Sequence, residues 1–125
     1  MRSPYRLLIN RAKSAAYPGQ VKKNGIKRTH ALEVSINHEW VEEQFKRQDG
    51  RCYWTNMIMD MNNVFMAGYP FSPSLERLDS DKGYTKDNVV LCLSLFNLGR
   101  RRWPEDKYKL LLNQLQNHYS QSAHA

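Results

Sequence analysis

Oxygen-donor side chains gather between residues 74 and 102, in a pattern that could bind a metal ion. They are three carboxylates and two amides: Glu76, Asp79, Asp81, Asn88 and Asn97. Mg²⁺ prefers such hard oxygen donors and usually takes only one or two from the protein, keeping water and phosphate as its other ligands. One carboxylate and one amide would therefore suffice for an ion that stabilises the charge developing in phosphodiester hydrolysis. A polar hairpin that caps its own turns with the same residues would need no metal.

Four arginines accompany these donors: Arg77, Arg100, Arg101 and Arg102. Guanidinium groups bind phosphate well, so these side chains could hold a nucleic-acid backbone beside the metal. The last three also end a predicted helix, where cations are favoured by the helix dipole alone. The sequence leaves both explanations open.

A hairpin followed by a helix is predicted to position the donors. Strands are expected at 74–79 and 88–92, a polar loop at 80–87 and a helix at 93–102. The carboxylate and the second amide would then lie on adjacent packed elements.

Other elements are predicted around this unit. Residues 52–73 have no clean period and should be irregular. The expected elements are a short basic helix at 5–16, a strand at 31–36, a helix from His38 to about Gln48 capped by Asn37, and a helix from Pro104 to about His118. The last helix carries an apolar stripe, which we expect to pack within the chain or, failing that, to form an interface: Tyr108, Leu111, Leu112, Leu115 and Tyr119.

Length and composition indicate one α+β domain. The chain has 125 residues, of which 41% are hydrophobic and 25% charged, which is typical of a globular protein. No apolar run is long enough to span a membrane, and the start lacks the apolar block of a secretory signal, so we expect a cytoplasmic protein. Cys52 and Cys92 are expected to be reduced and buried, with one disulfide as the alternative.

Positive charge is concentrated at the beginning of the chain. Residues 1–32 hold no acid and eight basic residues: Arg2, Arg6, Arg11, Lys13, Lys22, Lys23, Lys27 and Arg28. The rest of the chain is close to neutral, although the whole carries +7. A cationic arm over residues 1–30 favours a polyanionic partner, with DNA first. The alternatives are a solubilising tail and, last, a targeting presequence, whose helix Pro4 and Pro18 would interrupt.

One segment resembles a known nuclease family. The run from Pro73 to Arg100, PSLERLDSDKGYTKDNVVLCLSLFNLGR, is similar to the core of the HNH, or ββα-metal, endonucleases. The likeness is greatest to small phage and homing-type members, whose core reads S-L-D-R-I-D, G-Y-T, D-N-V and then a helix containing Asn. Upstream, QDGRCYWTN resembles the Gly-x-Cys-x-x-Thr-Gly turn that often precedes that core, so the likeness covers about residues 45–102.

The resemblance implies a role for four residues. Glu76 stands where the family has its metal-binding carboxylate, and Asn97 stands at the second ligand position, for Mg²⁺ or Mn²⁺. Asn88 matches the Asn that braces the loop. Arg77 replaces the His that usually activates water, and an arginine stays protonated near neutral pH. Three explanations stay open: Arg77 clamps the phosphate, which we favour; another group acts as base (His30, His38 or Tyr84); or the site is inactive.

The resemblance also bears on zinc and on function. Many members hold a structural zinc with two cysteine pairs, but Thr55, Leu93 and Phe96 stand where three of the thiolates would be. We therefore expect no structural zinc. The implied protein is an HNH-type endonuclease core at 31–103, with residues 104–125 as a final helix and frayed tail. It would act on DNA as a monomer or homodimer, encoded by a phage or mobile element in a bacterial host. The alternatives are a catalytically inactive DNA-binding module and an RNA-directed nuclease.

Overall fold

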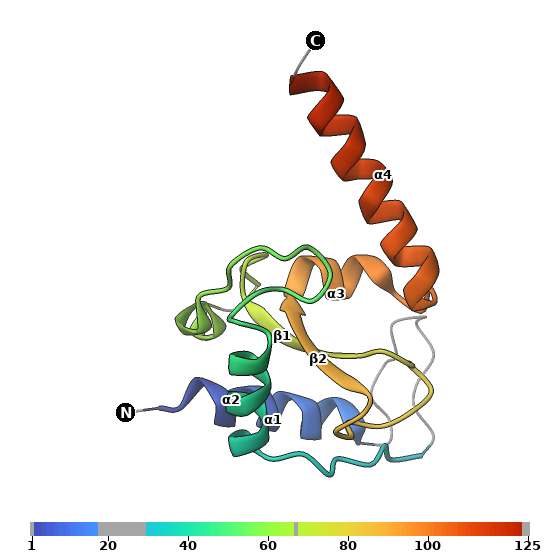
Figure 1. Ribbon diagram of the computed structural model, residues 1–125. Coiled ribbons are helices and arrows are strands. Elements are labelled where there is room, and N and C mark those ends of the chain that lie inside the picture. Colours follow the sequence, from blue (N-terminus) through green and yellow to red (C-terminus); the bar gives the residue numbers. More distant parts are fainter. Residues whose placement is uncertain (1, 18–29, 67, 124–125) are drawn as a thin grey trace.

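The computed structural model describes residues 2–17, 30–66 and 68–123, and it contains four α-helices and one small antiparallel sheet (Figure 1). The mixed α+β composition is as predicted. None of the helices in the described ranges is long and apolar enough to cross a membrane. The elements in chain order are α1 (Pro4–Ala16), α2 (His38–Arg47), the 3-10 helix η1 (Met61–Phe65), β1 (Pro73–Arg77), β2 (Val89–Leu93), α3 (Ser94–Arg100) and α4 (Glu105–Ala123).

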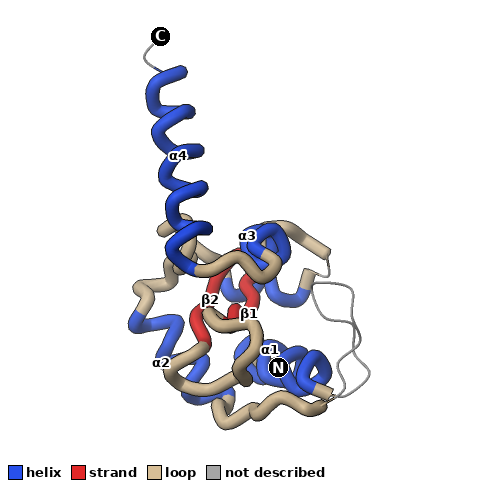
Figure 2. The backbone as a smooth tube through the Cα atoms, turned by 90° about the vertical axis from the view of Figure 1, so that its right-hand side faces the viewer, coloured by secondary structure: helices blue, strands red, loops and turns tan. Residues whose placement is uncertain are grey.

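The hairpin and the helix after it form the centre of the domain. Strands β1 and β2 pair in a register that runs from Pro73 opposite Leu93 to Arg77 opposite Val89. Helix α3 follows β2 directly and packs on both strands, while α1 and α2 lie on the other side (Figure 2). The predicted strand, loop, strand and helix are all present, with boundaries shifted by one or two residues.

Helix α1 is part of the core and not a free arm. Leu8, Ile9 and Ala12 are buried against α2 and η1, because apolar residues recur on one face of the helix. Ser3 caps its first turn by accepting a hydrogen bond from the backbone N–H of Arg6. The expectation of an arm is therefore corrected over residues 4–16: only the outer face of this helix is available to a partner.

The segment predicted as a strand at 31–36 is mostly irregular. Val34 makes a single parallel bridge to Tyr84, with Tyr84 N donating to Glu33 O at 2.7 Å and Ser35 N donating to Tyr84 O at 3.0 Å. Tyr84 lies on the loop between β1 and β2 and not on a strand. Because the backbone of that loop changes direction, it cannot continue the regular series of hydrogen bonds that a strand needs. Helix α2 then begins as predicted, with Trp40 N donating to Asn37 Oδ1 at 2.8 Å.

Helix α4 projects from the body of the molecule (Figures 1 and 2). Tyr108, in its first turns, is buried in the core, and Leu112 is partly buried. By contrast, Leu111, Leu115 and Tyr119 are 58%, 46% and 67% exposed. The prediction that this stripe packs within the chain is therefore wrong for its outer half.

Candidate active site

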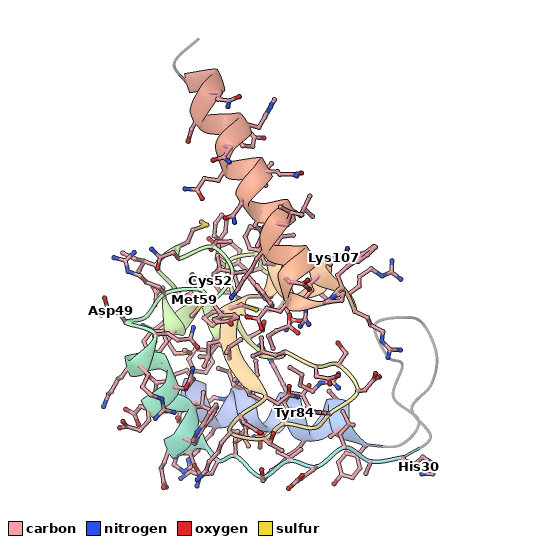
Figure 3. All side chains as sticks on the ribbon, turned by 45° about the vertical axis from the view of Figure 1, so that its right-hand side comes forward. His30, Asp49, Cys52, Met59, Tyr84 and Lys107 are labelled. Atoms are coloured by element: carbon pink, nitrogen blue, oxygen red, sulfur yellow. The ribbon has the colours of Figure 1, made fainter. Side chains whose placement is uncertain are left out.

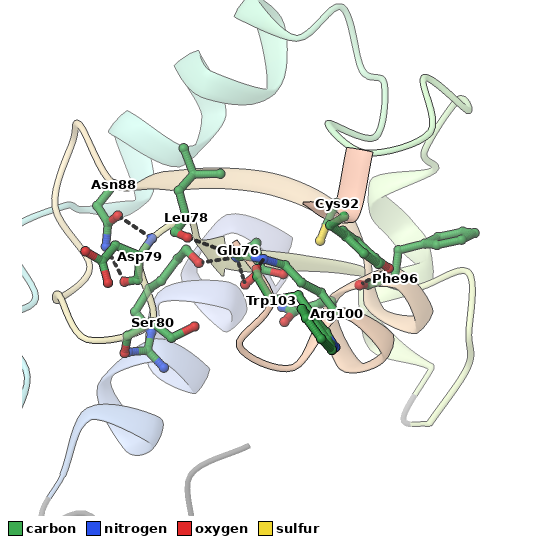
Figure 4. Close-up of polar contacts among 12 residues, drawn as sticks. Glu76, Leu78, Asp79, Ser80, Asn88, Cys92, Phe96, Arg100 and Trp103 are labelled. Atoms are coloured by element: carbon green, nitrogen blue, oxygen red, sulfur yellow. Dashed lines mark hydrogen bonds and ion pairs between the residues drawn. The ribbon is translucent and has the colours of Figure 1, made fainter. Parts of the chain in front are cut away.

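Glu76 lies at the centre of the site in a buried ion pair with Arg100. The Glu76 side chain is 1% exposed and that of Arg100 is 2% exposed, and Oε1 of the carboxylate lies 3.2 Å from Nη1 of the guanidinium (Figure 4). Glu76 comes from β1, and Arg100 comes from the last turn of α3. The pair therefore joins the hairpin to the helix that covers it.

Backbone carbonyls and an indole ring complete the surroundings of Arg100. Its Nε donates to Trp103 O at 2.8 Å and its Nη1 donates to Arg77 O at 2.7 Å, and Nη2 donates to Leu78 O. The guanidinium carbon also lies 5.1 Å from the centre of the Trp54 ring. Arg100 was expected to contact the DNA backbone, and its burial corrects that expectation. Its side chain is bonded to Glu76 and to three backbone carbonyls inside the protein, so a nucleic acid cannot reach it.

Asn97 lies one turn before Arg100 on the same face of α3. Its Nδ2 donates to Ser74 Oγ and to Leu75 O, both at 3.0 Å. Side chains alternate along a strand, so Ser74 and Glu76 share the face of β1 that α3 covers. The two residues expected as metal ligands, Glu76 and Asn97, thus both lie where β1 and α3 pack together, with Asn97 bonded to the strand residues that precede Glu76.

These two donors fit a hard divalent cation in kind, but Arg100 competes with it. A carboxylate and an amide oxygen are suitable ligands for Mg²⁺ or Mn²⁺. An ion at the Glu76 carboxylate would lie a few ångströms from the guanidinium, where two positive charges in a buried site repel strongly. A metal would therefore have to displace Arg100 from Glu76. Among the described residues, no three of the types His, Cys, Asp and Glu come together as a metal cluster.

Asn88 braces the loop between the strands. Its Oδ1 accepts from Asp79 N at 2.9 Å, while its Nδ2 donates to Asp79 O at 3.1 Å and to Gly83 O at 2.9 Å (Figure 4). Gly83 lies against Glu33, and a Cβ atom there would come within 2.5 Å of Glu33 O. The loop is thus held from inside by Asn88 and from outside by close backbone packing.

Arg77 faces away from Glu76. The alternation of the strand directs the two neighbouring side chains to opposite faces of the hairpin. Arg77 Nη1 donates to Ser80 O at 2.5 Å and to Lys82 O at 3.2 Å, and its guanidinium lies 5.2 Å from the centre of the Tyr84 ring. In this conformation Arg77 is bonded to the backbone of the loop between β1 and β2 and helps to hold that loop in place.

The three residues considered as alternative bases lie in different places. His30 is exposed at the edge of the molecule, and Tyr84 is buried on the hairpin loop (Figure 3). His38 begins α2, where its Nε2 lies 3.4 Å from Glu39 Oε1. Of the three, Tyr84 is the one in contact with Arg77.

The remaining predicted nucleic-acid contacts lie on two surfaces. Arg2, Arg6, Arg11 and Lys13 are exposed on or beside α1, although Arg11 Nη2 also donates to Val64 O at 2.8 Å. Arg101 and Arg102 are exposed after α3, and Arg102 pairs with Asp81. A hollow of about 280 Å³ opens beside them, lined by residues that include Asp79, Asp81, Arg100 and Arg102. Lys22, Lys23, Lys27 and Arg28 lie outside the described residues.

Both cysteines are buried thiols. Cys52 Sγ accepts from Leu93 N at 3.4 Å, so the turn before η1 is attached to the end of β2. Of the positions where the family carries zinc thiolates, Leu93 is buried and Phe96 is partly buried in the core.

Sequence reasoning missed the connecting role of Arg100 and the contribution of Ser74. Helical spacing could have indicated the first, because Asn97 and Arg100 are three residues apart and must share a face of α3. Strand alternation could have indicated the second. Comparisons of this chain with profiles of known protein families, with curated proteins and with solved structures found no match.

Proposed function

We propose that this protein is a divalent-metal-dependent endonuclease that hydrolyses phosphodiester bonds in DNA. One observation carries the proposal: Glu76 of β1 pairs with Arg100 of α3, and Asn97, one turn earlier on α3, bonds to the two residues of β1 that precede Glu76, beside a loop braced by Asn88. This combination agrees with the motif order that resembles the HNH endonucleases. We further propose that the protein is encoded by a phage or mobile element and acts in the cytoplasm of a bacterial cell.

Each site residue has a distinct role in this proposal. Glu76 and Asn97 would hold Mg²⁺ or Mn²⁺, and an ion bound there would stabilise the charge that develops on the phosphate and the leaving oxygen. Arg77 would hold phosphate, because its guanidinium stays charged and cannot take a proton from water. To reach a phosphate at Glu76, its side chain would have to leave Ser80 O and Lys82 O and turn from the opposite face of the hairpin. Asn88 fixes the loop that carries Arg77's partners, Ser80 and Lys82.

DNA would approach through the exposed cations. Arg6 and Lys13 are exposed on α1, at the edge of the face that its apolar residues bury. Arg101 and Arg102 lie beside the hollow next to Arg100. Contacts of this kind neutralise phosphates and position the protein without reading sequence.

A second candidate function is a DNA-binding module without catalysis, and the Glu76–Arg100 pair favours it. In that case the buried arginine permanently takes the place of a metal as the counter-charge of Glu76. Both candidates predict binding to DNA, so they differ only in cleavage.

Plasmid nicking separates the two. Supercoiled DNA is incubated with the full chain in Mg²⁺, Mn²⁺ or EDTA, together with Glu76→Gln and with Glu39→Gln as the control, since Glu39 is 75% exposed on α2. The nuclease proposal expects metal-dependent relaxation that Glu76→Gln abolishes and Glu39→Gln retains. Intact plasmid in every lane, also with phage and bacterial DNA, together with a retained mobility shift, would favour the silent module. Faster cleavage of structured RNA at matched salt would identify RNA as the substrate.

A further inference from the structure

A hollow opens between helix α3 and the connection from η1 to β1. Its volume is about 460 Å³, within the range of about 300–1,000 Å³ that is typical of small-molecule sites. Much of its lining is apolar and comes from Met66, Tyr69, Pro70, Pro73, Leu95 and Leu98. Leu98 is 69% exposed and Leu95 54%. Exposed apolar side chains that gather around one hollow indicate a binding site, which we call the α3 groove.

Hydrogen bonds hold the two sides of the α3 groove together. Ser94 Oγ, at the start of α3, donates to Tyr69 O at 3.1 Å, and Leu95 N donates to Pro70 O at 3.2 Å. Ser94 N also donates to Ser72 O at 2.7 Å. Walls that are fixed in this way lose little freedom when a ligand enters, so the groove is formed before binding.

The charge of the groove favours an anionic ligand. Arg11 of α1 is part of its lining, and Arg11 Nη2 donates to Val64 O at 2.8 Å. A guanidinium has five N–H donors, of which this bond uses one, and it binds phosphate in a defined orientation. Among the described residues that line the groove, none is Asp or Glu. The groove is therefore complementary to an apolar or aromatic group with a negative charge beside it.

Aromatic side chains favour a flat ligand. Tyr69 lines the groove, and the ring centre of Phe71, which is 48% exposed, lies 5.6 Å from that of Tyr69. Nucleobases of any sequence stack on such rings, while arginine holds the backbone beside them. A base inside a duplex cannot enter a groove of this kind unless it leaves the stack. The chemistry of the α3 groove thus matches an unpaired nucleotide.

The groove borders the candidate active site. Ser74 of β1 lines it, and Asn97 Nδ2 donates to Ser74 Oγ at 3.0 Å. A strand that lies in the groove therefore passes beside Asn97, which the proposed function assigns to the metal. This position favours a substrate strand over an acidic peptide, which an apolar groove beside a cation would also accept.

We propose that the α3 groove binds an unpaired base of a single-stranded stretch of DNA, with Arg11 on the neighbouring phosphate. This inference rests on the proposed function, because it names the class of DNA that reaches the candidate active site. The base stacks on Tyr69 and packs against Leu95 and Leu98. Single-stranded or locally opened DNA then makes contacts that a fully paired duplex cannot make.

Fluorescence anisotropy in EDTA tests the groove without any cleavage. The probes are a labelled strand of about 12 thymidines, a strand of the same length with abasic sites in place of the thymidines, and a duplex of the same length. The full chain should bind the thymidine strand roughly ten-fold more tightly than the abasic strand, because the two differ in their bases and not in their phosphates. Equal affinity for the two strands would overturn the proposal.

Two matched pairs of variants locate the binding. Leu98→Glu places a negative charge in the groove, and Leu115→Glu places the same charge on α4, at positions that are 69% and 46% exposed. Tyr69→Ala removes the ring from the groove, and Tyr119→Ala removes a 67% exposed ring from α4. Each groove variant should bind the thymidine strand roughly five-fold more weakly than its control, with a smaller difference for the duplex.

Circular dichroism verifies that each variant folds. Leu98→Glu changes an exposed position, so it tests the groove even if Tyr69→Ala does not fold.

The outcomes separate this inference from the proposed function. Equal binding of the thymidine strand by Leu98→Glu and Leu115→Glu would overturn the groove assignment, even if wild type nicks plasmid DNA in Mg²⁺, and would leave an acidic peptide as the candidate ligand. Weaker strand binding by Leu98→Glu, together with intact plasmid in every lane, would support the groove and contradict the nuclease.

Discussion

Glu76 and Arg100 face each other across the junction of β1 and α3, with their charged atoms 3.2 Å apart and both side chains almost fully buried. This pair has two consequences. It ties the helix to the hairpin, because Arg100 also binds the backbone carbonyls of Arg77, Leu78 and Trp103. It also sets a cation against the carboxylate that the proposed function assigns to a metal.

Removing Arg100 alone should destabilise the fold strongly. Arg100→Met leaves the Glu76 carboxylate buried without its counter-charge, which typically costs about 3–5 kcal/mol. Urea denaturation of wild type and variant measures the difference in the free energy of unfolding. Glu76→Gln combined with Arg100→Met should recover much of the loss, since neither charge then remains. A cost below about 1 kcal/mol for the single variant would show that the pair does not hold the helix to the hairpin.

Removing the Asn88 amide should loosen the loop between the strands. Asn88→Ala deletes three hydrogen bonds and leaves the Asp79 N–H without its acceptor, at a cost of about 1–3 kcal/mol. Hydrogen exchange of the Asp79 amide should accelerate accordingly. Asn62→Ala, at an exposed position of η1, is the control and should leave the exchange of Asp79 unchanged. Equal protection of Asp79 in Asn88→Ala and wild type would contradict the bracing role.

Charge on the outer face of α1 should govern the salt dependence of DNA binding. Arg6→Ala and Lys13→Ala each remove one exposed cation, so each should lower the slope of log affinity against log salt by about 0.9. Fluorescence anisotropy with a labelled duplex at several salt concentrations measures the slope. Lys46→Ala removes a 64% exposed cation from α2 and should have a smaller effect. Identical slopes for all four proteins would mean that α1 does not contact the phosphates.

Titration of Tyr108 should make the free energy of unfolding depend on pH in the alkaline range. Burial raises the pKa of its hydroxyl from about 10 to about 12, so the folded protein favours the protonated phenol. Its contribution to the free energy of unfolding is therefore complete below pH 10 and lost as the pH rises through about 12. Tyr108→Phe lacks this titration but also loses the hydrogen bond to Phe96 O, worth about 0.5–1.5 kcal/mol.

Denaturant unfolding of both proteins between about pH 8 and pH 12 checks this prediction. Wild type should be the more stable at pH 8, and its advantage over Tyr108→Phe should shrink and then reverse at the alkaline end. A difference that stays constant over the whole range would show that Tyr108 does not titrate as proposed.

The local elements of this fold were predictable from sequence, and the long-range pairings were not. Residue periodicity and Asn37 were enough to predict α2, and alternation with turn residues predicted the hairpin. The segment at 31–36 has the same alternation, but its neighbour is a loop, and no local pattern contains that fact.

The same distinction applies to the site. Asn88 acts within its own hairpin, so its contacts follow from the motif order. Arg100 ends a helix and would ordinarily lie in solvent, and only its packing against Glu76, on the earlier strand β1, reveals its place. The outer part of α4 carries an apolar stripe like that of a core helix, yet nothing in the described part of the chain covers it. An apolar stripe predicts that a helix face will be buried, but it does not say which surface buries it.

Titration with Mn²⁺ is the most direct test of whether Glu76 is a metal ligand. Isothermal calorimetry on wild type, Glu76→Gln and Arg100→Met, each verified as folded by circular dichroism, measures the number of ions bound and their affinity. The proposed function predicts one ion per wild-type chain, tighter binding by Arg100→Met, in which the competing guanidinium is gone, and no binding at this site by Glu76→Gln. Mn²⁺ binding that is absent from all three proteins, or unchanged by Glu76→Gln, would contradict the proposed metal site and leave a DNA-binding module whose buried carboxylate serves only the fold.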